Sequence, residues 1–490
     1  MVVKACDRCR LSKEKCAIAT DNPACTRCIR LKLPCSILRR NKRVSRRLSP
    51  KTPVGGTQVS SVESVASDSH ASSTVSSRRS MSTSLTNVTE ASWTPESTGA
   101  VVIAPEKLLA STLNLQSTSD ALRTVLDVEQ FSVIHLPFML GSSFIPESQK
   151  TVYALLCLSA PTLTEGYLAF LGLMTSYQRS LVMRRGEPDM CKAAIGLQRL
   201  RSVKISHDYD AACALFLGQT MYVFNVLTAP YSNTAHSIVR SALMSTKKWL
   251  PRLIQFPIMD TITMTPILID TVECLIHREI PIIRLHPQRR IIVDRYAGLC
   301  ATLLPHLYDI CECSHTLKRN VFEAGSESHS AIYDRLDDIE EALQYWRPKT
   351  PAHIFENYGQ HAVLAMVTQA NVYRLAALLL IHRLRHPLGV EHAGAQKLAN
   401  NIFAELAFFA KSSAKETTAL PVVFPLTMAM FEIKGPGEDL LERLASFAVQ
   451  SSSASRLQEF VKLVRSSRES GFEGTLFDLV DTHLHVAMPP

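Results

Sequence analysis

The chain has 490 residues, of which 46% are apolar and 20% are charged. This length exceeds what one hydrophobic core usually supports, and the apolar share is that of an ordinary globular protein, which excludes a disordered activator with only a small folded head. The formal net charge of +9 is concentrated in residues 1–50, where fourteen Lys or Arg stand against three Asp or Glu, so the remaining 440 residues sum to about −2. A basic segment before a nearly neutral body indicates a polyanionic partner.

Six of the thirteen cysteines lie in the first 35 residues, in the spacing C-x2-C-x6-C, which occurs twice: Cys6, Cys9, Cys16, Cys25, Cys28 and Cys35. The five residues before them are too few for a signal peptide, so we expect a chain that is not secreted, with thiolate ligands rather than disulfides. Two four-coordinate zinc ions need eight bonds, so six sulfurs suffice only if two of them bridge both metals. The spacing therefore predicts a binuclear zinc cluster, and near-symmetry favours one bridging sulfur from each half without identifying it.

The residues between these cysteines also agree with a known family. A C-R-x-x-K-x-K-C block is present at Cys9, Arg10, Lys13, Lys15 and Cys16, and Pro23 shortly precedes the fourth cysteine. In these features the segment resembles the fungal binuclear zinc cluster transcription factors. It departs from several relatives at Ser12, where they have a second Lys or an Arg, and this bears on one phosphate contact rather than on the fold.

The resemblance implies two zinc ions per chain, with Cys6 and Cys25 as the bridging ligands. It implies a cluster that reads CGG- or TCG-like triplets in the major groove of double-stranded DNA, where Lys13 donates to guanine and Arg10 and Lys15 hold the backbone. It further implies a nuclear regulator of RNA polymerase II genes that works with the transcription machinery, and analogy within the family suggests control of a secondary-metabolite gene cluster. The alternative is a zinc-containing scaffold that touches no specific DNA.

A basic arm follows the cluster, with six cations in the nine residues from Arg39 to Arg47, among them Arg40, Lys42 and Arg43. So many like charges keep a segment solvated, and we interpret the arm as a nuclear import signal and a phosphate contact rather than a merely soluble linker. Residues 49–104 are rich in Ser and Thr and poor in large apolar side chains, which predicts a disordered linker. We therefore expect a DNA-binding domain at 1–48, a linker at 49–104 and a helical regulatory domain at 105–490.

A coiled coil directly after the linker would explain self-association as a homodimer. Leu108, Leu115 and Leu122 do repeat at seven residues, but the partner positions 111 and 118 are Ser and Thr. Because a zipper needs both apolar seams, this segment favours an ordinary amphipathic helix.

From residue 105 onwards the apolar period is helical and β-hairpin signals are absent, so we predict an all-α body and a mostly α chain. The clearest expected helices are 167–184, 211–227, 232–249, 333–346, 362–384 and 395–409, with breaks at Pro188, Pro230, Pro251, Pro348, Pro351 and Pro387. The stretches 339–348 and 373–387 resemble the helical regulatory domain of the same fungal factors. The acidic residues of 333–346 lie largely off the apolar face of this expected helix, which indicates that the apolar face packs against the rest of the body. The alternative is an acidic activation helix.

Two long apolar stretches, 151–177 and 211–239, raise the question of a membrane. Pro161 interrupts the first, and polar residues such as Gln219 and Asn225 interrupt the second, so we interpret both as buried helices and expect no membrane partner. Weaker metal candidates are Cys311 with Cys313 and His315, His382 with His386, and Asp481 with His483 and His485. No sequence motif of nucleophilic or metal-dependent hydrolysis, and no phosphate-binding loop, is present, so nothing supports an enzyme, including one with a DNA-binding head.

Overall fold

The computed structural model describes residues 115–179, 187–229, 234–320, 329–412, 420–444, 451–484 and 488–490. All of them belong to one structural unit, Pro95–Pro490. Within these ranges the regular elements are α-helices and short 3-10 helices, with one isolated bridge between Asp294 and Gly298. The prediction of a mostly α body is therefore confirmed. The expected zinc-binding domain and linker, together with Leu108, lie outside the described residues.

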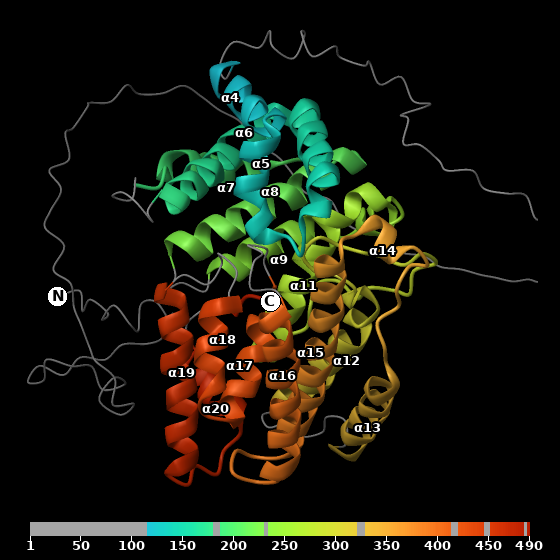
Figure 1. Cartoon of the computed structure of the whole chain (residues 1–490), viewed down its shortest axis with the longest axis vertical. Helices are drawn as coiled ribbons and strands as arrows, with labels where there is room; N and C mark the ends of the chain where they lie inside the picture. Colours follow the sequence, from blue (N-terminus) through green and yellow to red (C-terminus); the bar gives the residue numbers. More distant parts are fainter. Residues whose placement is uncertain are drawn as a thin grey trace, which may run out of the picture. The chain divides into compact units, whose positions relative to one another are not determined.

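The first half of this body is built around two long helices, α6 and α8 (Figure 1). The helices are α4 (Leu115–Leu126), α5 (Val128–His135), α6 (Ile145–Arg179), α7 (Met190–Ser202), α8 (Asp208–Thr228), α9 (Thr234–Thr246) and α10 (Leu250–Leu253). Three 3-10 turns join them, η1 (Leu136–Phe138), η2 (Ser142–Phe144) and η3 (Pro257–Met259). Helix α6 contacts α4, α5, α7 and α8, and α8 contacts α9 and α11 in turn.

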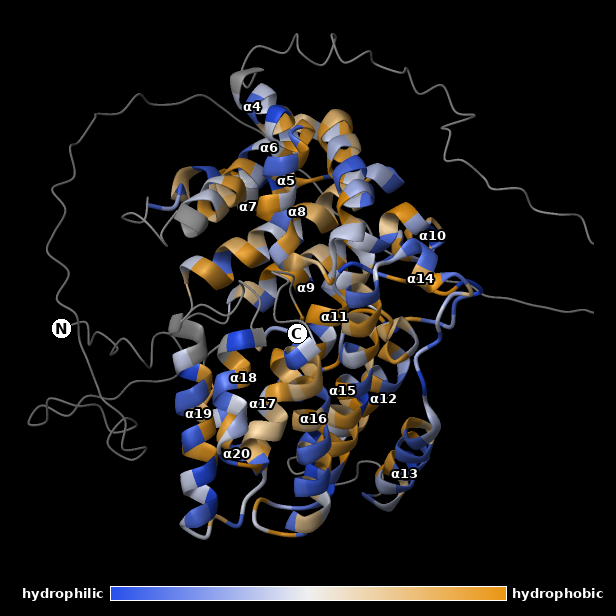
Figure 2. Ribbon diagram, viewed as in Figure 1, coloured by the Kyte–Doolittle hydropathy of each residue, from blue (hydrophilic) through white to orange (hydrophobic). Residues whose placement is uncertain are grey.

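The second half surrounds α15, which is buried along most of its length. It comprises α11 (Asp260–His277), η4 (Cys300–Thr302), α12 (Leu304–Asn320), α13 (His329–Tyr345), α14 (Ile354–Asn357), α15 (Gln360–Arg385), α16 (His392–Ser412), α17 (Val423–Glu432), α18 (Pro436–Leu444), α19 (Ser451–Glu469) and α20 (Leu476–His483). Figure 2 shows the apolar sides of these helices turned towards one another and their polar sides turned outwards. This is the pattern expected when amphipathic faces drive packing.

Helix α6 is kinked in its middle. Ser159 has φ −145° and ψ 49°, outside the helical region, and Pro161 lies two residues further on. Proline lacks the N–H of a helical hydrogen bond and its ring clashes with the preceding turn, so a bend at this point is expected. The interpretation of Pro161 as an interruption is thus half right, because the helix bends there and continues.

Helices α6 and α7 cross at a pair of glycines. A Cβ atom on Gly196 would lie 2.8 Å from the Cα atom of Gly166, closer than real Cβ contacts. The absence of side chains at both positions therefore lets the two backbones touch.

The described parts of the two amphipathic segments pack within the body, as an amphipathic helix is expected to do. In α4, Ala121 and Val125 are fully buried and Leu122 packs against the core, and the helix contacts α6. In α13, the buried residues Ile332, Leu336, Ile339 and Leu343 face α12 and α15. Both helices use their apolar faces within the body.

Three helical stretches are long and apolar enough to cross a membrane when judged by length and composition alone: Ser142–Ser176, Asp208–Thr228 and Gln360–Arg385. Other parts of the body bury 56%, 83% and 78% of their most apolar windows. The interpretation of the first two stretches as packed helices agrees with this burial. The third stretch, Gln360–Arg385, was expected to be a helix, but the sequence did not raise the question of a membrane there.

Candidate functional site

The residues predicted to bind zinc and DNA all precede the first described residue, Leu115. This holds for the six cysteines from Cys6 to Cys35 and for Arg10, Lys13, Lys15, Arg39, Arg40, Lys42 and Arg43. Their geometry therefore stays a prediction. Within the described body, one set of buried polar groups converges on Asp270.

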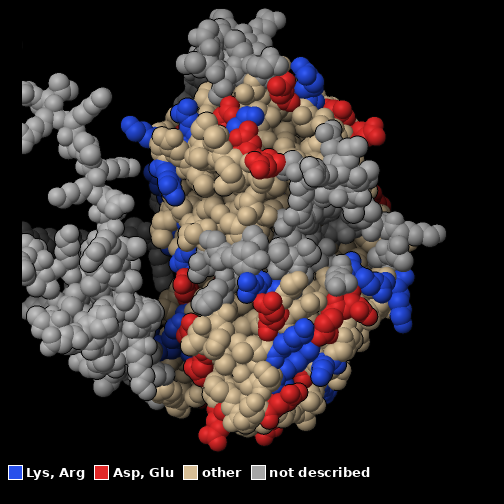
Figure 3. Space-filling view, turned by 90° about the vertical axis from the view of Figure 1, so that its left-hand side faces the viewer, with Lys and Arg blue, Asp and Glu red and all other residues tan. Residues whose placement is uncertain are grey.

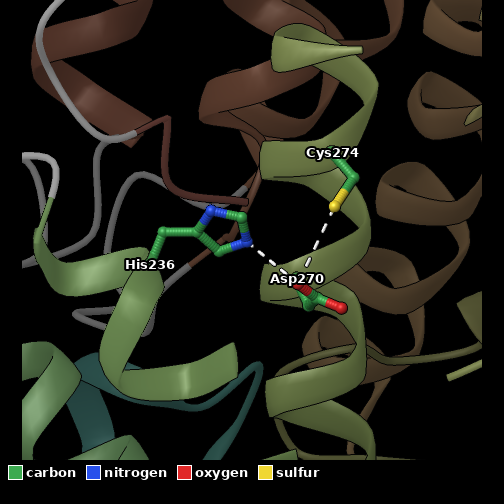
Figure 4. Close-up of side chains that lie close together, drawn as sticks. All are labelled: His236, Asp270 and Cys274. Carbon is green, nitrogen blue, oxygen red and sulfur yellow. Dashed lines mark hydrogen bonds and ion pairs between the residues drawn. The ribbon is translucent and has the colours of Figure 1, made fainter. Parts of the chain in front are cut away.

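Asp270 lies on α11 and collects donors from three segments of the chain (Figure 4). Its Oδ1 atom lies 2.9 Å from Nε2 of His236 on α9, and Cys274, one turn further along α11, donates its thiol to the same oxygen at 3.7 Å. Its Oδ2 atom accepts the backbone N–H of Ile282 at 2.6 Å. The carboxylate is 1% exposed, so these bonds replace the water that it would otherwise bind.

Histidine, aspartate and cysteine are metal-ligating residue types, and their ligand atoms here lie within 4.8 Å of one another. The surroundings nevertheless do not fit a metal ion. The Nη1 atom of Arg240 lies 3.1 Å from Sγ of Cys274 and 3.5 Å from Oδ1 of Asp270, so a guanidinium already supplies the positive charge. Burial also raises the pKa of the Cys274 thiol far above its usual value, whereas a metal would need the thiolate.

The cluster is therefore best explained as a joint between α9 and α11. Arg240 extends it outwards by donating to Glu279 at 2.9 Å and to the carbonyl oxygen of Ile280 at 3.3 Å. One buried carboxylate thus fixes α9 against both α11 and the chain that follows α11.

A second buried network joins α15, α17 and α19. Arg383 and Glu432 are 0% and 1% exposed and form two parallel bonds, Nε to Oε1 at 2.8 Å and Nη2 to Oε2 at 2.7 Å. Arg468 donates to the same Oε2 at 2.8 Å. Arg383 also donates through Nη1 to the carbonyl oxygens of Pro387 and Val390, each at 3.0 Å, so most of its donors are satisfied. Such bidentate geometry is the form in which a buried ion pair is tolerated.

The weaker metal candidates are engaged elsewhere. Cys311 donates to the carbonyl oxygen of Thr271 at 3.8 Å, and His315 Nδ1 lies 3.0 Å from the carbonyl oxygen of Arg278. His382 Nε2 lies 3.0 Å from the carbonyl oxygen of Glu391. Asp481 pairs with Lys318, and His485 lies outside the described residues.

Most cysteines of the body are buried: Cys213, Cys274, Cys300, Cys311 and Cys313 are buried, whereas Cys157 is half-buried and Cys191 is exposed. Burial raises the pKa of the Cys213 thiol to about 12, which keeps it protonated at neutral pH. Cysteines that are scattered through apolar segments and odd in number are expected to be reduced, buried thiols, and this expectation is wrong for Cys191.

The surface charge of the body is mixed. On the face shown in Figure 3, basic and acidic side chains alternate over the described surface and do not gather into a patch of one sign. This agrees with the small net charge outside residues 1–50. A phosphate backbone would find no extended basic surface on this face.

Comparison with known families finds two matches. Residues 4–44 match the fungal Zn(2)-Cys(6) binuclear cluster domain. Residues 236–466 match the fungal specific transcription factor domain, which in this structure extends from α9 into α19. Comparison with curated proteins and with solved structures finds no significant match.

Proposed function

Because the chain belongs to the fungal binuclear zinc cluster transcription factors, we propose that it is a nuclear regulator that reads CGG- or TCG-like triplets in the DNA major groove through its first 48 residues. The observation that carries the proposal is the match at residues 4–44, which contains all six cysteines and the basic block around Lys13. Domains of this kind bind zinc and DNA, and neither matched domain indicates catalysis.

The ligand set fits two zinc ions held by six thiolates. Cys9 and Cys16 would hold one ion, Cys28 and Cys35 would hold the other, and Cys6 and Cys25 would serve both. The two ions supply the rigid centre of a segment that is too short to build an apolar core. The basic residues can then be held in fixed positions against the duplex.

The basic residues of the N-terminal segment have two different roles, base recognition and phosphate contact. Lys13 reads guanine through O6 and N7, Arg10 and Lys15 hold the phosphate backbone near the cluster, and the arm from Arg39 to Arg47 follows the phosphates beyond it. The nearly neutral helical body adds regulation and self-association rather than DNA affinity. Targets among RNA polymerase II genes, in a secondary-metabolite cluster, are the biological setting that we propose for it.

Replacement of Lys13 by alanine tests the reading of bases. We expect the variant to lose about 1–3 kcal/mol of binding free energy on a CGG-containing duplex and much less on a random duplex. Gel-shift or anisotropy titrations of both duplexes at one salt concentration measure this difference, and metal analysis shows that both variants keep their zinc. Lys32→Ala, outside the basic block, is the matched control.

Equal small losses of binding free energy on both duplexes would show that the Lys13 side chain is solvated and contacts no base. A wild-type chain that prefers neither duplex would contradict sequence-specific binding altogether and favour the scaffold alternative. Genomic neighbours of the gene test the proposed pathway independently.

Neutralising the arm tests the division of roles. Changing Arg39, Arg40, Lys42 and Arg43 to glutamine should weaken binding to every duplex alike, because phosphate contacts carry no sequence information. The slope of log affinity against log salt should become shallower by about 0.9 for each phosphate that the variant no longer neutralises. Salt titrations of wild type and variant measure it, and a changed triplet preference would contradict the assignment.

A further inference from the structure

Four exposed cations lie around helix α10 and the start of α8. Lys204 precedes α8, Lys247 and Lys248 precede α10, and Arg289 lies in the chain between α11 and η4. None of these four side chains takes part in an ion pair among the described residues. Their charge is therefore available to a partner.

Two contacts bring the segments that carry these cations together. Arg252 on α10 is 66% exposed and pairs at 2.7 Å with Asp208, the first residue of α8, which follows Lys204 by four positions. Nη2 of Arg290 donates to the carbonyl oxygen of Ile254, directly after α10, at 2.6 Å, so the residue before Arg290 also lies beside α10. We call this region the basic surface, and it consists of Lys204, Lys247, Lys248, Arg252 and Arg289.

The acidic side chains that lie nearest along the chain are already engaged. Asp208 pairs with Arg252, and Asp210 accepts two backbone N–H groups of the turn before α8 at 2.9 and 3.0 Å. Asp294 is 1% exposed and accepts two backbone N–H groups at 2.9 and 2.6 Å. Asp260 is 4% exposed and is held by a guanidinium at 2.6 Å. The four unpaired cations therefore keep an excess of positive charge on the basic surface.

Buried donor atoms in the same region also lack acceptors. Nε1 of Trp249 and Nε of Arg290 are buried and have no hydrogen-bond partner, and Nζ of Lys248 lies 5.1 Å from the centroid of the Trp249 ring. One acceptor, Oδ1 of Asp208, is in the same state. Donors thus outnumber acceptors, and a carboxylate is a ligand group that supplies acceptors and negative charge together.

Exposed apolar side chains lie among these cations. Tyr209, next to Asp208, and Ile291, two residues after Arg289, are each 39% exposed. A phosphate backbone offers such side chains no apolar partner, whereas protein interfaces combine aromatic anchors with a charged rim. Helix α10 is seen at the right-hand side of the body in Figure 2, the side that faces away from the viewer in Figure 3. The basic surface therefore differs from the face of mixed charge in Figure 3.

We propose that the basic surface is a docking site for an acidic peptide segment of a partner protein, one in which Asp or Glu alternates with large apolar side chains. The carboxylates of the peptide pair with the four free cations and accept the Trp249 indole N–H, and its apolar side chains cover Tyr209 and Ile291. This interaction is separate from DNA recognition by residues 1–48, and it gives the helical body a partner of its own.

The test uses the full chain and a fluorescent peptide with the sequence Glu-Asp-Phe-Glu-Leu-Leu written twice. We expect the triple variant Lys247→Glu, Lys248→Glu, Arg289→Glu to bind the peptide at least about tenfold more weakly than the wild-type chain does, because three attractive contacts become repulsive. Anisotropy titrations at one salt concentration measure the affinities. Residues 1–50 are the same in both chains, so their positive charge does not enter the comparison.

The matched control is the triple variant Lys349→Glu, Lys397→Glu, Lys434→Glu, which makes the same change of net charge at exposed lysines elsewhere on the body. We expect it to lose less than about threefold in affinity. Equal losses in the two triple variants would overturn the proposal, because they would show that only the net charge of the chain matters.

Two single variants keep the test open whether or not the triple variant folds. Trp249→Phe keeps a ring but lacks the N–H, and Lys204→Gln removes one charge; each should weaken binding by about threefold or more. Unchanged affinity in both would overturn the proposal, as would equal binding of a peptide in which Ser replaces Phe and Leu. If the triple variant lost as much affinity for a random DNA duplex as for the peptide, the basic surface would be a phosphate-binding surface instead.

Discussion

Replacement of Arg383 by alanine is expected to lower the free energy of unfolding of the helical body by about 3–5 kcal/mol, because it leaves Glu432 charged, buried and without its bidentate partner. Glu432 is 1% exposed, and Arg468 alone would have to neutralise it. The change also frees the carbonyl oxygens of Pro387 and Val390. Urea unfolding followed by the fluorescence of Trp249 and Trp346 measures the loss.

Arg385→Ala is the matched control on the same helix. Arg385 is 20% exposed and pairs with Asp337 and Glu340 at the edge of α13. Partly exposed pairs are worth about 0–1 kcal/mol, so the control should lose several-fold less stability. Similar losses of unfolding free energy in the two variants would contradict the prediction that the buried Arg383–Glu432 pair contributes more to stability than a partly exposed pair.

Removal of zinc is expected to have the largest effect on function. A chelator should strip two ions per chain, abolish preference for any triplet and leave the helical body folded, because structural zinc contributes about 10–16 kcal/mol to so small a domain. Cys25→Ser should act in the same way, because in the proposed cluster this sulfur is shared by both ions and its loss would weaken both sites. Native mass spectrometry counts the zinc, and circular dichroism follows the body.

Cys191→Ser is the matched control, because Cys191 is the exposed cysteine of the described body and should leave both ions in place. One zinc with two unliganded thiols in the wild-type chain would contradict the bridged cluster. A body that unfolds on chelation would contradict the separation of the two domains.

The sequence predicts the zinc site more sharply than any feature of the body, and the reason is physical. Ligands that lie close along the chain leave their spacing in the sequence, as the six N-terminal cysteines do. His236 and Asp270 are 34 positions apart and meet only because α9 packs on α11. The available signal was the pair of acidic residues, Asp270 and Glu273, inside an otherwise apolar segment. Acidic side chains that a helix buries need partners, although the sequence does not say which.

The helices predicted most accurately from the sequence are those in which the helical repeat of apolar residues runs without interruption. The expected segments 211–227 and 362–384 correspond to α8 and α15 within a few residues at each end. Helix α11 was missed, and it contains Pro266 in an apolar segment with no polar face. Local sequence rules predict that a helix ends at a proline. Helix α11 nevertheless continues past Pro266, because packing on all of its sides stabilises it.

The backbone N–H of Met488 donates to Oε1 of Glu273 on α11 at 3.0 Å, and this bond also bears on how the body folds. It joins residues that are 215 positions apart, so we expect it to form late, after most contacts between neighbouring helices. The entropy of closing such a loop grows slowly with its length, so the cost is modest, but the step comes late. Until it occurs, Glu273 is turned towards the core without its backbone donor, and water or a proton must take that place. We therefore expect the surroundings of Glu273 to lose water in two steps during folding, first as α11 packs and then as residues 488–490 take their place.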